Sequence, residues 1–216
     1  MTFVATRVSS LPLRLTSCLP QRILDADYPE KHKYVLLIQH GMTTSEPTPE
    51  MVAFYERRTY EHIERVRHCL TIMASITEYT NELAERARVH DASKFGPEER
   101  VPYIWLTEFH RCRRSGEPFT YPEGMEERVR AAIDHHMTGN RHHPDFHADP
   151  NEMTDVDLIE MVCDWTAMSQ EFGQDNGSAR GWADKTIGGR LQLNEEKRQF
   201  VYAIIDLLDS HHNMDR

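Results

Sequence analysis

The hydrophobic pattern of this chain changes at about Thr48, and the change limits which folds the chain can adopt. From there on, apolar residues recur at steps of three and four, beginning with Met51, Phe54 and Tyr55. Apolar residues at that spacing share one face of an α-helix, whereas a strand would alternate apolar and polar residues. The pattern therefore predicts a long helical segment from about 48 to 88.

Glycine and proline residues separate this segment from four further predicted helices, because neither residue continues a helix well. These helices are one from Pro97 through Phe109 to a stop at 115–118, one over about 123–136, one capped by Thr154 and one capped by Asn194. Threonine and asparagine side chains accept hydrogen bonds from the first amides of a helix, which makes them common caps. The sequence thus predicts an all-α core, with a loop after 136 that carries several histidines.

The first 47 residues lack these helical signals. Their apolar and polar side chains alternate over Phe3–Arg7, Leu11–Leu15 and Tyr34–Gln39. Such alternation favours a small β-ribbon, although arginines with no acidic residue before Asp25 would also suit an organellar transit peptide. We predict two parts, an irregular or β-ribbon extension over 1–47 and a helical domain over 48–216.

Composition and charge argue against several classes of partner. The chain has 216 residues and a formal net charge of -10, without a lysine-rich or arginine-rich run, so polymeric nucleic acid is not expected to bind. The longest apolar run, Tyr34–Ile38, is far too short to span a membrane. Four cysteines stand far apart without a Cys-x-x-Cys motif, which favours the reducing cytoplasm. The oligomeric state stays open, with a homo-oligomer as one alternative.

The adjacent His90-Asp91 pair is the centre of a candidate metal site, since an imidazole and a carboxylate there can bind one ion. In chain order, the candidate ligands are His62 or His68, His90, Asp91, His136, His142, His143 and Asp164. Each alone is more often an ordinary solvated or capping residue, and the histidines could form a surface tract. Their joint occurrence in one helical chain nevertheless predicts a metal centre.

Helix geometry helps to choose among these candidates. His62 stands one turn before Val66 on the apolar face, so its ring can point inward, whereas His68 points about 240° away. We therefore expect His62 to bind and keep His68 as the alternative. Asp164 lies at the edge of the apolar face of its own helix, where a divalent cation would compensate the cost of burying its charge.

The succession His62, His90-Asp91 and Asp164 resembles the signature of the HD-domain metal-dependent phosphohydrolases, which are all-helical. More closely, Thr59–Phe95, Asp157–Met168 and the motif Asn140-x-His142-His143-Pro144 look like an uncharacterised HD-like family of bacteria and phages. The resemblance implies an HD-domain-like helical bundle. It also implies that one divalent ion is held by His62, His90, Asp91 and Asp164, and a second by His136, His142 and His143.

Such a site predicts hydrolysis of a small phosphate ester, by fold analogy a nucleotide. The ligands suit Mn, Fe, Co, Ni or Zn, and one or two such ions would activate water. We expect Lys94 and Arg141 to contact the phosphate, unless they are simply exposed, and Asp91 or another carboxylate to orient the water. Two alternatives stay open: a di-iron oxygenase of the HD type and a non-catalytic metal-binding or regulatory module.

Overall fold

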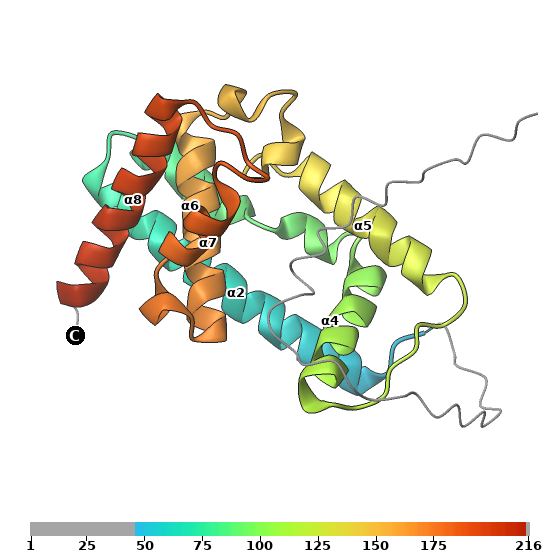
Figure 1. Ribbon diagram of the computed structural model, residues 1–216. Helices are drawn as coiled ribbons and strands as arrows, with labels where there is room; N and C mark the ends of the chain where they lie inside the picture. The colour runs from blue at the N-terminus through green and yellow to red at the C-terminus, as the bar shows by residue number, and fades with distance from the viewer. Residues whose placement is uncertain (1–45, 215–216) are drawn as a thin grey trace, which may run out of the picture. The chain divides into compact units, whose positions relative to one another are not determined.

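The computed structural model describes residues 46–214, in which no strand forms (Figure 1). The α-helices are α2 (Pro49–Ile76), α3 (Thr80–Val89), α4 (Arg100–Ser115), α5 (Met125–Gly139), α6 (Asp155–Phe172), α7 (Arg180–Thr186) and α8 (Glu195–Met214). Short 3-10 helices lie between them: η1 (Ala92–Phe95), η2 (Pro144–Phe146), η3 (Pro150–Glu152) and η4 (Asp175–Gly177). The all-α prediction is confirmed, while the predicted β-ribbon and the alternative transit peptide fall on 1–45, outside the described residues. Within 46–214, no helix has the length and apolar character needed to cross a bilayer.

The single helical segment predicted from 48 to 88 is two helices, so that part of the prediction was wrong. α2 ends at Ile76, and Thr77 follows in an extended conformation with φ -121° and ψ 169°. The Thr77 hydroxyl donates a hydrogen bond of 2.8 Å to the carbonyl of Met73. α3 then packs back against α2, and its buried Leu83 joins the same core. The apolar period could not reveal the break, because both helices face one core.

The predicted caps are confirmed. Thr154 accepts a hydrogen bond from the amide of Asp157, and the Asp157 carboxylate accepts one from the amide of Thr154, which forms a capping box at the start of α6. The Asn194 side chain accepts a bond of 2.9 Å from the amide of Lys197 in α8. α4 ends at Gly116, whose φ of 72° is in the left-handed region that glycine adopts most easily. Helix α7 was not predicted, because so short a helix shows no clear period.

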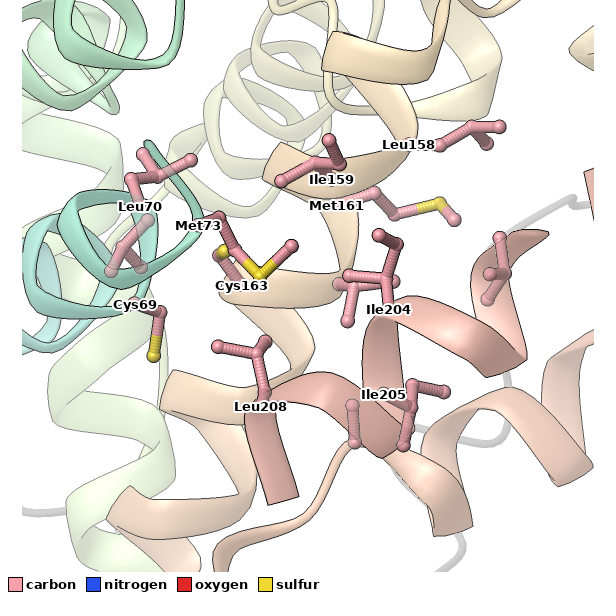
Figure 2. Close-up of a cluster of buried hydrophobic side chains, with 14 of the residues drawn as sticks. Cys69, Leu70, Met73, Leu158, Ile159, Met161, Cys163, Ile204, Ile205 and Leu208 are labelled. Carbon is pink, nitrogen blue, oxygen red and sulfur yellow. The ribbon is translucent and has the colours of Figure 1, made fainter. Parts of the chain in front are cut away.

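The larger core lies between α2, α6 and α8 (Figure 2). The side chains that meet there include Cys69, Leu70 and Met73 from α2, Leu158, Ile159, Met161 and Cys163 from α6, and Ile204, Ile205 and Leu208 from α8. All of them are almost completely buried. Burial of one large apolar side chain is worth about 1.5–3 kcal/mol, so this core fixes α6 firmly against α2.

A smaller core lies between the first half of α2 and helices α4 and α5. Its buried members are Met51, Tyr55, Ile104, Trp105, Met125 and Val129. α2 therefore belongs to both cores, since its residues from Val66 onward pack in the larger one. His62 lies on α2 between these two stretches, at a position where polar side chains from several helices can gather.

Candidate metal centre

His90 and Asp91 form the turn that joins α3 to η1. His90 follows the last residue of α3, and Asp91 has φ 57° and ψ 16°, in the left-handed region that residues other than glycine rarely adopt. Such conformations cost on the order of 1–3 kcal/mol and tend to occur at functional sites. Here the turn carries both side chains into the interior, where His90 is 4% and Asp91 is 1% exposed.

One carboxylate oxygen of Asp91 faces a first group of ligand atoms. Asp91 Oδ2 lies 3.5 Å from Nε2 of His62 and 3.7 Å from Nε2 of His90. From α6, Asp164 Oδ1 lies 3.0 Å from the same nitrogen of His62 and 3.9 Å from that of His90. We name these four residues, His62, His90, Asp91 and Asp164, the first set.

The other carboxylate oxygen of Asp91 faces the histidines of α5 and of the loop that follows. Asp91 Oδ1 lies 3.3 Å from Nε2 of His136 and 3.8 Å from Nε2 of His142. The His143 ring lies against both, with its centroid 4.9 Å from that of His136 and 4.2 Å from that of His142. We name Asp91, His136, His142 and His143 the second set. Asp91 therefore belongs to both sets.

Several buried atoms of the two sets have no hydrogen-bond partner among the residues that the structure describes. They include Nε2 of His90, His142 and His143, and Oδ1 of Asp91. A buried polar atom without a partner costs on the order of 1–3 kcal/mol, so a site that gathers several of them calls for a ligand that satisfies them together. Imidazole nitrogens and carboxylate oxygens are ligands of divalent transition ions, and such ions fit this donor set.

Two buried glutamates contact the Nδ1 atoms of these histidines, on the side of each ring away from Nε2. Glu160 Oε1 lies 2.9 Å from Nδ1 of His90 and 3.5 Å from Nδ1 of His142. Glu99 Oε2 lies 2.9 Å from Nδ1 of His136. When Nδ1 is protonated and donates to a carboxylate, the ring presents the lone pair of Nε2 to the centre. A carboxylate behind a histidine ligand in this way is usual in the metal centres of proteins.

Neighbouring charges keep the carboxyl groups of the centre ionised. Burial acts to raise the pKa of Glu160, but hydrogen bonds from His142 and His90 outweigh it and lower this pKa to about 2. Burial also opposes the ionisation of Asp91, yet Lys94 and the surrounding histidines hold its pKa well below the usual range. The centre therefore offers anionic carboxylate oxygens together with imidazole nitrogens. A bound cation would neutralise the negative charge of the carboxylates.

The two cations predicted to bind phosphate lie in different places. The Lys94 ammonium donates a hydrogen bond to Asp91 Oδ2 and so contacts the centre. The Arg141 guanidinium instead donates two hydrogen bonds to Asp157, of 3.1 and 3.0 Å. Asp157 is fully buried and also binds Arg86 at 2.6 Å, so the two arginines neutralise it together. The structure thus does not bring Arg141 to the histidines, and Arg141 ties their loop to the start of α6.

The structure brings all the predicted metal ligands into the two sets, and His68, the alternative to His62, is exposed on α2. From the sequence, Glu160 could either support a metal ligand or face solvent, and nothing singled out Glu99. Glu160 stands four residues before Asp164, so that both face one side of α6, and this spacing was the available signal. Glu99 offered no such signal, because only tertiary packing brings it to α5.

A family model matches residues 51–207, a stretch that covers most of the chain and contains both sets. The chain belongs to the DUF5662 family. DUF5662 is a family of unknown function, so membership does not by itself assign an activity. Searches of curated proteins and of solved structures gave no match. The activity of the chain is therefore inferred from the geometry of the centre.

Proposed function

We propose that this chain is a metal-dependent phosphohydrolase that acts on a small phosphate ester through a two-metal centre. The observation that carries the proposal is the position of Asp91, whose one carboxylate oxygen faces His62 and His90 and whose other faces His136 and His142. Asp91 would then help to hold an ion in each set, and two bound ions would supply the chemistry of two-metal hydrolytic sites. The resemblance of His62, His90-Asp91 and Asp164 to the HD-domain signature supports the same reaction.

The residues of the chain fix the donor atoms in place. When bound, divalent ions such as Mn, Fe, Co, Ni or Zn lower the pKa of water and polarise a phosphoryl oxygen. Glu160 and Glu99 hold His90 and His136 by Nδ1, so each Nε2 keeps its direction without further ordering. Such preorganisation is how a protein contributes to hydrolysis of this kind.

Lys94 is the cation that we assign to the substrate phosphate. Its side chain is 18% exposed, and its ammonium lies 5.8 Å from the centre of the Tyr103 ring. Because it already contacts Asp91, a phosphate held at the centre would meet the ammonium and accept a charge-assisted hydrogen bond from it. A small nucleotide is the expected class of substrate by analogy with HD-domain enzymes, and the net charge of -10 argues against a polymeric nucleic acid.

A di-iron oxygenase of the HD type is the second candidate function. Histidines outnumber carboxylates in the two sets, and imidazole suits iron as well as zinc. Iron in the purified protein together with oxygen consumption would favour this candidate. Hydrolysis of phosphate esters with Mn or Zn in the absence of oxygen would favour the hydrolase.

Elemental analysis of untagged protein tests the centre. We expect two transition ions per chain in the wild type and loss of both in Asp91→Ala, because Asp91 serves both sets. His68→Ala is the matched control, since His68 is exposed on the same helix as His62 and should leave the metal content unchanged. Circular dichroism checks that each variant keeps its helices.

A panel of small phosphate esters then tests the reaction. Turnover that requires metal and is lost in Asp91→Ala is the expected result. Metal binding without turnover of any ester would refute the hydrolase and favour a metal-binding or regulatory module. If wild-type protein retains no metal even after reconstitution, the centre itself is refuted.

A further inference from the structure

A pocket of about 420 Å³ lies away from the histidines, where the C-terminal ends of α4 and α6 meet the first half of α2. The residues that line it are Phe54, Arg57, Arg58, Glu61, Arg114, Glu171 and Phe172. Its volume is in the range of small-molecule sites. None of these residues belongs to the two metal sets or to the glutamates behind them, so the pocket is a separate feature of the fold.

Three arginines line this pocket, and two of them have no ion-pair partner in the part of the chain that the structure describes. Arg58 forms an ion pair with Glu171. Within residues 46–212, Arg57 and Arg114 form no ion pair, and each lies over an aromatic ring, 5.4 and 5.9 Å from its centre. The other carboxylate of the lining, Glu61, is directed to a different arginine at 3.9 Å. Burial and then the charge of Arg58 lower the pKa of Arg114, although the carboxylate of Glu171 acts to raise it.

A histidine beside the pocket reports the same excess of positive charge. The pKa of His110 in α4 is lowered to about 4, first by burial and then by the charges of Arg58, Arg114 and Arg113. An anion would relieve this repulsion. Guanidinium groups donate paired hydrogen bonds that match the oxygens of a phosphate or a carboxylate, so these are the groups that the pocket favours.

The pocket lies along the same pair of helices as the metal centre. α2 and α6 run antiparallel, because His62 meets Asp164 whereas Arg58, one turn before His62, meets Glu171, two turns after Asp164. At 1.5 Å per residue, these steps amount to about 6 Å along α2 and about 10 Å along α6. Measured along these helices, the Arg58–Glu171 pair at the pocket therefore lies one to two turns from the His62–Asp164 pair of the centre, which is within the length of a small molecule.

We propose that this pocket binds a second anionic group, a phosphate or a carboxylate, of the molecule whose phosphate ester lies at the metal centre. The substrate is then a small phosphate ester with two anionic groups, one at the metal ions and one at Arg57 and Arg114. The substrate assignment rests on the hydrolase function proposed above, whereas binding of an anion to the pocket does not.

Calorimetric titration of metal-free Asp91→Ala protein with inorganic phosphate and with malonate tests the pocket by itself. One site should appear for at least one of these anions, and their relative affinities show whether the pocket prefers a phosphate or a carboxylate. The further changes Arg57→Gln and Arg114→Gln together should weaken binding about tenfold or more, because they remove the two guanidinium groups that form no ion pair within residues 46–212.

The matched control for this titration is Arg128→Gln with Arg130→Gln, two exposed arginines on α5, which should leave anion affinity unchanged. Wild-type protein treated with a chelator provides a second background if Asp91→Ala does not fold. No anion binding in either background, or equal binding in the two double variants, would overturn the pocket.

Steady-state kinetics of the metal-loaded wild type test the substrate. With a sugar bisphosphate and the matching monophosphate as probes, kcat/KM should favour the bisphosphate by about tenfold or more. The Arg57→Gln and Arg114→Gln pair should remove this preference by raising KM for the bisphosphate, with the monophosphate unaffected. Equal kcat/KM for both esters in the wild type would overturn the substrate assignment. If no ester is hydrolysed, the proposed function fails, and the phosphate titration alone still decides anion binding.

Discussion

The larger core and the candidate metal centre are both built on α2 and α6, yet they depend on their residues in different ways. In the core, side chains such as Leu158 and Leu208 need only be apolar and of suitable volume. In the centre, the position of individual atoms matters: one nitrogen of His90 contacts Glu160, and the other faces Asp91 without a hydrogen-bond partner among the described residues. Stability of the fold and affinity for metal should therefore respond to different mutations.

The largest expected effect is a loss of stability, without a loss of metal, when a side chain of the larger core is shortened. Leu208→Ala should lower the free energy of unfolding by about 2–5 kcal/mol, because it leaves a cavity where α8 packs on α2 and α6. Urea denaturation of metal-free protein measures this loss. Metal stoichiometry of the variant, measured well below its melting temperature, should stay at the wild-type value.

Leu207→Ala is the matched control, since Leu207 is the next residue of the same helix and is 43% exposed. Its effect on stability should be within about 0.5 kcal/mol. If both variants lost the same stability, or if Leu208→Ala lost metal while still folded, the separation between core and centre would be wrong.

A smaller effect, on metal affinity, is expected from a change at Glu160, which contacts two of the histidines. Glu160→Gln keeps the shape of the side chain but removes the charge that holds His90 and His142, so metal affinity should fall roughly 10- to 100-fold. Competition with a coloured chelator measures the affinity. Glu196→Gln, an exposed glutamate of α8, should leave it unchanged. Equal affinity in wild type and Glu160→Gln would show that Glu160 supports the fold alone.

The same contrast explains how much of the fold the sequence predicted. Helix periods and the caps Thr154 and Asn194 depend on neighbours a few residues away, so they can be recognised from sequence. The break at Thr77 could not, because α3 returns to the core that α2 already faces and continues its apolar pattern. Local signals thus predicted the class of fold but not every helix boundary.

The centre was predicted as far as residue type and resemblance allow. Histidine and aspartate side chains are recognisable as ligands wherever they stand, which is why His62 and Asp164 could be proposed from distant segments. The partner of a charged side chain depends on what lies nearby in space, and Asp157 could not be recognised as the partner of Arg141 from the sequence. For the same reason, Glu99 could not be recognised from the sequence as the partner of His136.

The smallest expected effect is a loss of stability on mutation of Arg141. It decides whether Arg141 contacts the substrate phosphate, as the sequence predicted, or anchors the loop, as its contacts in the structure indicate. If Arg141 anchors the loop through Asp157, Arg141→Gln should lower the free energy of unfolding at pH 7 by roughly 0.5–1 kcal/mol, a modest value because the guanidinium is 44% exposed. KM for phosphate esters should change little. A large rise in KM with unchanged stability would instead restore the predicted contact with phosphate.

The pH dependence of this difference tests the pair of Arg141 and Asp157 directly. Burial opposes the ionisation of Asp157, but hydrogen bonds from Arg141, Thr154 and Arg86 outweigh it and lower its pKa below the usual 3.8. Because the folded state holds this proton less tightly than the unfolded state, the stabilisation is complete well above pH 3.8 and is lost as the pH falls through the lowered pKa. The gap between wild type and Arg141→Gln in urea denaturation should therefore close in acid. A gap that persists undiminished at pH 2 would mean that Arg141 stabilises the loop by packing over Phe146, 5.1 Å from its ring centre, rather than by its charge.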